Sequence, residues 1–290
     1  MRIFDPHIHM TSRTTDDYES MYAAGVRALV EPAFWLGQPR SNVGSFLDYF
    51  DGLIGWERHR AAQFGIRHHA TIALNPKEAN DPRCTPVLDE LERYLVKDGV
   101  VAVGEIGYDS MTPAEDVAFG RQLELAVRHS LPVLIHTPHR DKLAGTARTL
   151  DVVRESGIAP RMVVVDHLNE TNAEMVKEAG AWMGFSIYPD TKMDEARMVE
   201  ILRRYGTERV LINSAADWGR SDPLKTAATG HAMLAGGFTP QDVEKVLWEN
   251  PVEFYGQSGQ LILDPIPGFE VEAPRSEEFE GNSILRGARA

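Results

Sequence analysis

The chain has 290 residues, of which 43% are apolar and 25% are charged, the balance of an ordinary globular protein. Its 43 acidic and 30 basic side chains give a formal charge of −13, which disfavours a nucleic-acid partner because phosphate binding draws on a basic surface. The sequence has no apolar run long enough to span a membrane, and we expect no signal peptide. The single Cys84 excludes an intramolecular disulfide. We therefore expect a cytoplasmic protein that acts on a small molecule.

Eight short apolar runs predict buried parallel strands, because most are apolar on both faces and end at turn residues. They cover residues 2–9, 26–31, 66–74, 100–106, 131–137, 161–167, 182–187 and 209–214. Helical patterns between them cover 86–95, 114–129, 172–179, 194–205, 224–235 and 240–249. This alternation predicts a distorted (β/α)8 TIM barrel over residues 1–256, with a doubly wound sheet as the alternative. The Pro- and Glu-rich residues 257–290 are expected to form an irregular extension rather than a second domain.

The active site of such a barrel lies at the carboxyl ends of its strands, and the first of these ends carries His7 and His9. A two-residue step along a strand returns a side chain to the same face about 6.6 Å away, so that both imidazoles could bind one divalent ion. Coincidence or a single core histidine is the alternative. The fourth strand carries Glu105 between two glycines, where a carboxylate is costly unless it is paired with a cation or bound to a metal.

Further polar residues follow the fifth, sixth and eighth strands. His136 and His167 each end an apolar run, and each alone is most simply a core histidine. Asp217 follows the eighth strand, with Asp222 as a second candidate and a helix cap or Asx turn as the structural alternative. Taken together, nitrogen and oxygen donors without a thiolate suit Zn, Mn, Fe, Co or Ni.

The order of these motifs resembles the TatD-type metal-dependent hydrolases of the amidohydrolase superfamily. The resemblance rests on His-x-His at 7–9, Gly-Glu-Ile-Gly-Tyr-Asp at 104–109, the later histidines and the closing segment 238–256. It implies hydrolysis, often of phosphodiesters in DNA, with one or two divalent ions (Zn, Mn, Mg, Ni or Fe). It also implies His7, His9 and Asp217 on one ion, His136 and His167 on a second, and Glu105 bridging the two.

Three segments depart from the family pattern. Leu74-Asn75-Pro76 stands where the family usually has His-Pro, Arg140-Asp141 comes two positions late, and residues 213–217 replace a Glu-Thr-Asp element. The sequence therefore leaves several possibilities for the type of bond that the protein cleaves. The alternatives are a phosphodiester or small phosphorylated substrate, a carbonyl substrate such as a lactone or amide (hydrolysed or decarboxylated), and a non-catalytic barrel that binds a partner.

Each candidate residue has an expected role. Asp217 would take the proton from the attacking water, while Glu105 would be shared by two ions about 3.5–4 Å apart. The residues expected to orient the imidazoles are Asp5, Asp166 and Asn213. The residues expected to contact substrate are His139, Tyr108 and Trp218. Of the adjacent pair His68 and His69, only one side chain is expected to face the barrel interior.

Overall fold

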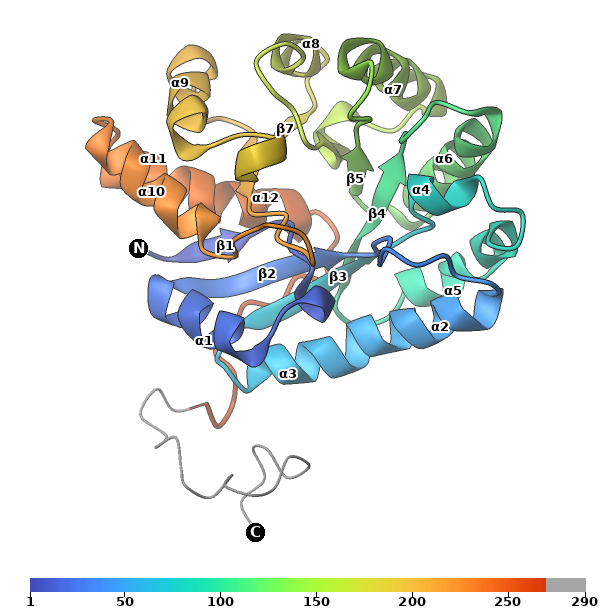
Figure 1. The fold of residues 1–290 in the computed structure, drawn as a ribbon, viewed down its shortest axis with the longest axis horizontal. Helices are drawn as coiled ribbons and strands as arrows, with labels where there is room; N and C mark the ends of the chain where they lie inside the picture. The colour runs from blue at the N-terminus through green and yellow to red at the C-terminus, as the bar shows by residue number, and fades with distance from the viewer. Residues whose placement is uncertain (270–290) are drawn as a thin grey trace.

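All eight predicted strands are present and form one parallel sheet in chain order, surrounded by helices (Figure 1). The computed structural model describes residues 1–269. The strands are β1 (Ile3–Asp5), β2 (Val26–Pro32), β3 (Arg67–Ile72), β4 (Val100–Gly107), β5 (Val133–His136), β6 (Val163–Val165), β7 (Trp182–Ser186) and β8 (Val210–Asn213). Past the strand ends, Ala215 N donates to His7 O at 2.9 Å and His9 N donates to Ala216 O at 2.9 Å. These bonds join the last strand to the first, so that the TIM barrel is confirmed and the doubly wound sheet is excluded.

Helices connect successive strands. They are α1 (Thr15–Ala24), α2 (Val43–Asp51), α3 (Arg58–Ala62), α4 (Pro76–Ala79), α5 (Leu91–Leu95), α6 (Pro113–His129), α7 (Lys142–Ser156), α8 (Ala173–Glu178), α9 (Glu195–Tyr205), α10 (Lys225–Ala235), α11 (Pro240–Glu244) and α12 (Asn250–Gly256). The predicted starts of α6 and α11 are confirmed, because Thr112 and Thr239 cap these helices with their side chains. The predicted helix 86–95 is instead a 3-10 turn followed by α5.

The longest helical regions without a counterpart among the predicted elements are α1, α7 and the continuous helix from α2 to α3. In α1 only Tyr18 and Met21 are buried, so that its apolar periodicity is weak. In α7 the buried face includes Thr146 and Thr149, which do not stand out as apolar positions. Both helices therefore bury fewer apolar side chains than are expected from the regular apolar spacing by which a helix is predicted from sequence.

The core has two parts. The larger part lies between the strands and the surrounding helices, and the smaller part lies inside the barrel that the strands enclose. The inner part is completed by Phe254 and Tyr255 of α12, whose rings pack against Trp182 and Phe4 respectively. Tyr255 also donates its hydroxyl hydrogen to Pro6 O at 2.7 Å. The segment that follows β1 is therefore supported from within the barrel by the last helix.

Residues 257–269 follow α12 without a helix or strand. They are held against β3, since the guanidinium of Arg67 donates to the carbonyl oxygens of Asp264 and Pro265 at 2.7 and 2.8 Å. The ring of Phe269 packs edge-on against Tyr22 at 5.2 Å. The division into a barrel and an extension at residue 256 stays a prediction, and the acidic part of that extension, residues 270–290, lies outside the described residues. No helix in residues 1–269 is long and apolar enough to cross a membrane.

Candidate metal centre

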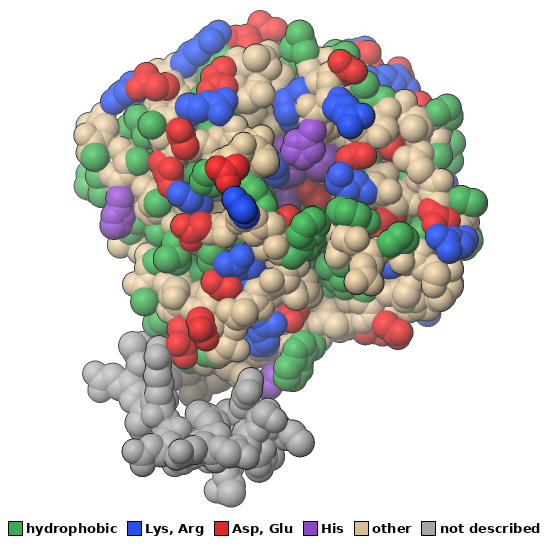
Figure 2. Space-filling view, viewed as in Figure 1, with side chains coloured by type: hydrophobic (Ala, Val, Ile, Leu, Met, Phe, Trp, Pro, Cys, Tyr) green, Lys and Arg blue, Asp and Glu red, His purple; other side chains and the backbone are tan. Residues whose placement is uncertain are grey.

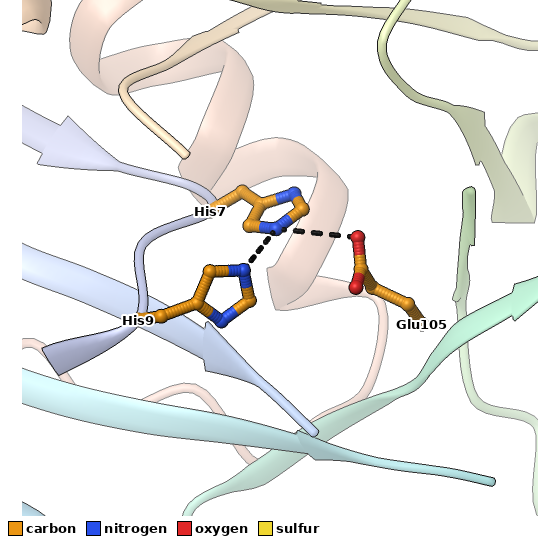
Figure 3. A group of neighbouring side chains, drawn as sticks. All are labelled: His7, His9 and Glu105. Atoms are coloured by element: carbon orange, nitrogen blue, oxygen red, sulfur yellow. Dashed lines mark hydrogen bonds and ion pairs between the residues drawn. The ribbon is translucent and has the colours of Figure 1, made fainter. Parts of the chain in front are cut away.

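His7 and His9 lie beyond β1 rather than in it. The prediction of a strand over residues 2–9 is wrong at its end, because β1 stops at Asp5 and the backbone then bends to bond with the residues after β8. The two rings nevertheless point toward one centre, with their Nε2 atoms 3.0 Å apart (Figure 3). Both side chains are buried.

Glu105 reaches this centre because β4 carries a bulge. The register between β4 and β5 shifts between Gly104 and Ile106, which leaves Glu105 as the unpaired residue. A Cβ atom on Gly104 would lie 2.7 Å from the Cβ of Leu134, so this close approach of β4 to β5 requires glycine. The carboxylate of Glu105 therefore enters the barrel beside His7, with 3.4 Å between Oε1 and Nε2 (Figure 3).

The histidines of the next two strands complete the group around Glu105. His136 ends β5 and His167 follows β6; their nitrogens lie 3.5 and 3.3 Å from Glu105 Oε1. His167 adopts a left-handed backbone with φ of 60°, a conformation that costs about 1 kcal/mol outside glycine. Its own amide donates to Asp166 Oδ1 at 2.7 Å, which holds this turn in place. The strain is thus balanced by the side chain that precedes it.

A shell of polar groups fixes the rings from behind. Asp166 Oδ2 lies 2.6 Å from His7 Nδ1, and both oxygens of Asp166 accept hydrogen bonds from Asn213 Nδ2. Asp5 accepts from the amides of His7 and Ser214. Asp166 therefore contacts an imidazole directly, whereas Asp5 reaches the site through backbone amides and Asn213 through Asp166.

The donor atoms fit a divalent ion. Three groups place their donor atoms within 4.8 Å of one another: His7, His9 and Glu105; His7, Asp166 and His167; and Glu105, His136 and His167. Neither ring nitrogen of His136 makes a hydrogen bond within the described residues, although this side chain is buried. A buried imidazole without a partner is costly, and a metal ion would satisfy it. All donors are nitrogen or oxygen, the set that zinc and similar ions accept.

The charge states also suit metal binding. Burial alone raises the pKa of Glu105, but the charge of His7 and the close imidazoles of His136 and His167 hold that pKa well below its usual value. Burial lowers the pKa values of His9 and His167 well below that of free histidine. Glu105 is therefore ionised and the imidazoles of His9 and His167 are neutral near pH 7, which are the forms that coordinate cations. Burial lowers the pKa of His7, but the charges of Glu105 and Asp166 outweigh it and raise that pKa, so His7 would release its proton when an ion binds.

Asp217 does not join the three donor groups found in residues 1–269. Its Oδ1 accepts hydrogen bonds from the Tyr188 hydroxyl at 3.0 Å and from Gly219 N at 2.7 Å. The other candidate, Asp222, accepts from Leu224 N at 2.8 Å just before α10. The assignment of either residue as a metal ligand stays a prediction.

The residues expected to contact substrate divide into two kinds. His139 lies near His136, with 6.0 Å between ring centroids, and Trp218 is exposed and packs edge-on against Trp35. Tyr108 differs from both, because its ring is buried against Phe119 and its hydroxyl donates to Asp116 of α6. Its contact with substrate stays a prediction.

Two polar residues of the centre escaped the sequence analysis as site residues. Asn75 donates to Glu105 Oε2 at 2.9 Å, and its place after the third strand was the available signal. Lys192 Nζ lies 3.1 Å from His167 Nδ1. It comes from the loop after β7, where no motif drew attention to it. On this face of the molecule, Lys and Arg side chains surround a hollow in which His side chains are visible (Figure 2).

Comparisons with known proteins agree with this geometry. The profile of the family described as TatD related DNase matches residues 4–256. An uncharacterized metal-dependent hydrolase of Methanocaldococcus jannaschii is 26% identical over 259 residues, covering 87% of this chain and 99% of that protein. The crystal structure of a TatD-like protein from Archaeoglobus fulgidus is 26% identical, with a TM-score of 0.72 and coverage of 87% and 99% of the two chains. A phosphotriesterase homology protein from Escherichia coli, complexed with phosphate, is 18% identical with a TM-score of 0.65 over 88% and 98%, and shares the fold.

Proposed function

The chain belongs to the TatD-related DNase family and is a metal-dependent hydrolase, and from this premise we propose that it cleaves phosphate esters at the cluster around Glu105. The observation that carries the proposal is the position of one carboxylate oxygen, Glu105 Oε1, within 3.3 to 3.5 Å of nitrogens from three buried histidines. These histidines come from three different strand ends. Such convergence has no use in packing, and it is what a shared ligand of divalent ions requires.

Each residue has a proposed part. His7 and His9 would hold one ion, His136 and His167 a second, and Glu105 would contact both. A divalent ion bound there supplies Lewis acidity and makes water a nucleophile near neutral pH. Zinc is the proposed native ion, because buried imidazole and carboxylate donors suit it.

Asp217 is the proposed proton acceptor. Its carboxylate follows β8 and is only partly buried, and the Tyr188 hydroxyl holds one of its oxygens. A carboxylate that is fixed in direction and open on one side can accept a proton from water. His139 and Trp218 remain the proposed substrate contacts at the rim.

The substrate is proposed to be a phosphodiester or a small phosphorylated molecule. The family supports phosphodiester cleavage, while the charge of −13 argues against long nucleic acid as the substrate. A cytoplasmic location is proposed from Cys84, which is buried and unpaired as expected in a reducing compartment.

The proposal is tested by replacing the shared carboxylate. Glu105→Gln keeps the size of the side chain but removes its charge, and we expect the bound metal to fall to a minor fraction and hydrolysis to fall by at least about 100-fold. Metal content is measured by mass spectrometry, and activity on phosphodiester, phosphomonoester and lactone panels with added Mn²⁺ or Zn²⁺.

Glu78→Gln is the matched control, since Glu78 is equally buried but pairs with Arg40 outside the centre. It should keep its metal and activity. Full metal content in Glu105→Gln would contradict the metal assignment. Turnover of lactones alone by the unaltered protein would contradict the phosphate-ester assignment.

A further inference from the structure

Lys192 is a cation at the metal centre that makes no direct ion pair with a carboxylate of residues 1–269, although the charges of Asp166, Glu105 and Asp217 act on it. It follows the short turn Pro189–Thr191 after β7, and its Nζ lies 3.1 Å from His167 Nδ1. No ion pair within residues 1–269 joins it to Asp or Glu, although the chain carries 43 acidic side chains. An ammonium group that is partly removed from water and has no direct ion pair gains a strong hydrogen-bond partner when an anionic ligand binds beside it.

Lys142 brings a second ammonium group to His167, at its backbone carbonyl oxygen rather than its imidazole. It is the first residue of α7, and its Nζ donates to Thr137 Oγ1 at 2.9 Å and to His167 O at 2.7 Å. Both acceptors are uncharged, so this cation too lacks a carboxylate partner among the described residues. Lys77, at the rim, is different, because it pairs with Asp109 at 2.9 Å.

The two ammonium groups come from different elements and repel each other, since burial and the charge of Lys192 both lower the pKa of Lys142. The His167 ring lies between Lys192 and Glu105: its Nδ1 faces Lys192 and its Nε2 faces Glu105. The charges of Glu105 and Asp217 also act on Lys192, so an anion that touches Lys192 lies close to the proposed metal centre. A group with two negative charges shared over several oxygens would satisfy both ammonium groups, whereas the oxygen of a neutral carbonyl would satisfy neither.

We propose that Lys192 and Lys142 form an anion subsite beside the proposed metal centre, which takes the phosphoryl group of the substrate. Lys192 determines specificity there, by favouring a phosphate ester over a neutral lactone or amide. This inference rests on the proposed function, since it places the substrate at the same centre.

The first test measures the binding of inorganic phosphate to the full-length, metal-loaded protein by titration calorimetry. We expect Lys192→Met to weaken phosphate binding about 10- to 100-fold, the loss of one charge-assisted hydrogen bond, and Lys192→Arg to recover most of it. Lys142→Met should weaken binding less, because two neutral groups already share that ammonium. Lys97→Met, which replaces an exposed lysine over the ring of Tyr94, is the control and should bind as the unaltered protein does.

Metal content measured on the same samples separates this inference from the proposed function. Equal phosphate affinity in the unaltered protein and Lys192→Met, at equal metal content, would overturn the subsite. Loss of metal in Lys192→Met would shift the decision to Lys142→Met, where unchanged phosphate affinity would again overturn it. Phosphate binding that depends on Lys192, in a protein that hydrolyses no phosphate ester, would support the subsite and contradict the proposed function.

With an active protein, a second measurement compares substrates. Lys192→Met should raise KM for a phosphodiester about 10-fold or more and leave KM for a lactone unchanged. An equal loss on both substrates would show a general structural role and would contradict specificity.

Discussion

Single side chains decide which nitrogen of each histidine is offered to a metal. Asp166 Oδ2 lies 2.6 Å from His7 Nδ1, and Ser186 Oγ lies 2.6 Å from His167 Nδ1. Because these contacts occupy Nδ1, the Nε2 atoms of His7 and His167 are the nitrogens that face Glu105. Such carboxylate and hydroxyl partners fix both the ring orientation and the tautomer of a ligating histidine.

His69 contributes to the stability of the fold rather than to the metal centre. Its side chain and that of His68 lie on opposite faces of the sheet. The pair divides as expected: His68 bonds Glu31, while His69 lies near Phe4 and accepts a hydrogen bond from Ile262 N. Burial lowers the pKa of His69 to about 3. The folded protein therefore holds this ring neutral over a range where the unfolded chain protonates it.

The sign of the resulting pH dependence follows from that difference. Above pH of about 6.5 the ring is neutral in both states, and its contribution is constant. As the pH falls from about 6.5 toward 3, the unfolded chain binds one proton more, so stability falls by up to about 1.4 kcal/mol per pH unit. His69→Gln should remove the contribution of about one proton to this slope, which is about 1.4 kcal/mol per pH unit. Urea unfolding at a series of pH values from 4 to 8 measures it, with the difference at pH 8 giving the packing cost alone; an unchanged slope would contradict the prediction.

At the scale of elements, the centre depends on close approach between neighbouring strands. The bulge in β4 turns Glu105 inward, and β7 passes so near the end of β6 that a Cβ atom on Gly184 would lie 2.5 Å from Asp166 Oδ1. The side chain that orients His7 therefore has its space only because β7 carries glycine at this position.

Gly184→Ala should test this packing. We expect it to destabilise the fold by about 1–3 kcal/mol, as overpacking does, and to lower metal affinity because Asp166 must move. Gly120→Ala in α6 is the matched control, since a Cβ atom there meets no atom within 4 Å and should stabilise the helix slightly. Thermal unfolding and metal titration of both variants measure the effects. Unaltered metal affinity in Gly184→Ala would show that the position of Asp166 does not control the centre.

At the scale of the whole molecule, the proposed ligands join segments that are distant in the chain. His7 and His167 are separated by most of the barrel in sequence, yet both lie beside Glu105. An ion bound only by the folded protein stabilises it in proportion to the logarithm of its free concentration over Kd. Metal binding should therefore raise the free energy of unfolding of the entire barrel.

Removal of metal is the corresponding experiment. At a free ion concentration of about 1,000 times Kd, binding adds about 4 kcal/mol, so EDTA should lower the Tm by roughly 10 °C. Re-addition of Zn²⁺ or Mn²⁺ should restore it. Glu105→Gln serves as the reference, because its Tm should not respond to EDTA; an equal response in that variant would place the stabilising ion elsewhere.

The charge of the whole chain also takes on a local meaning. The total of −13 disfavours long nucleic acid, but the centre itself combines ionised Glu105 and Asp166 with the unpaired cations Lys142 and Lys192. A net negative chain and the proposed subsite for a single phosphoryl group are compatible. Their combination favours a short or small phosphate ester.

The sequence by itself determined the architecture and the residue types gathered near the carboxyl ends of the strands. Eight apolar runs with turn residues between them are compatible with few folds, and donor residues at strand ends are visible because carboxylates and imidazoles are rare in apolar runs. Helices with weak amphipathic patterns, such as α1 and α7, escaped it because tertiary burial supplies what their sequences lack.

Only the tertiary structure decided where each side chain points. Tyr108 stands within the same motif as Glu105, but a bulge turns the glutamate inward while the tyrosine packs against α6. Lys192 carries no local signal, since its role depends on His167, 25 residues away in the chain. Periodicity describes a side chain relative to its own strand, whereas contacts between strands depend on bulges, close glycine approaches and loop paths, which are fixed only when the barrel closes.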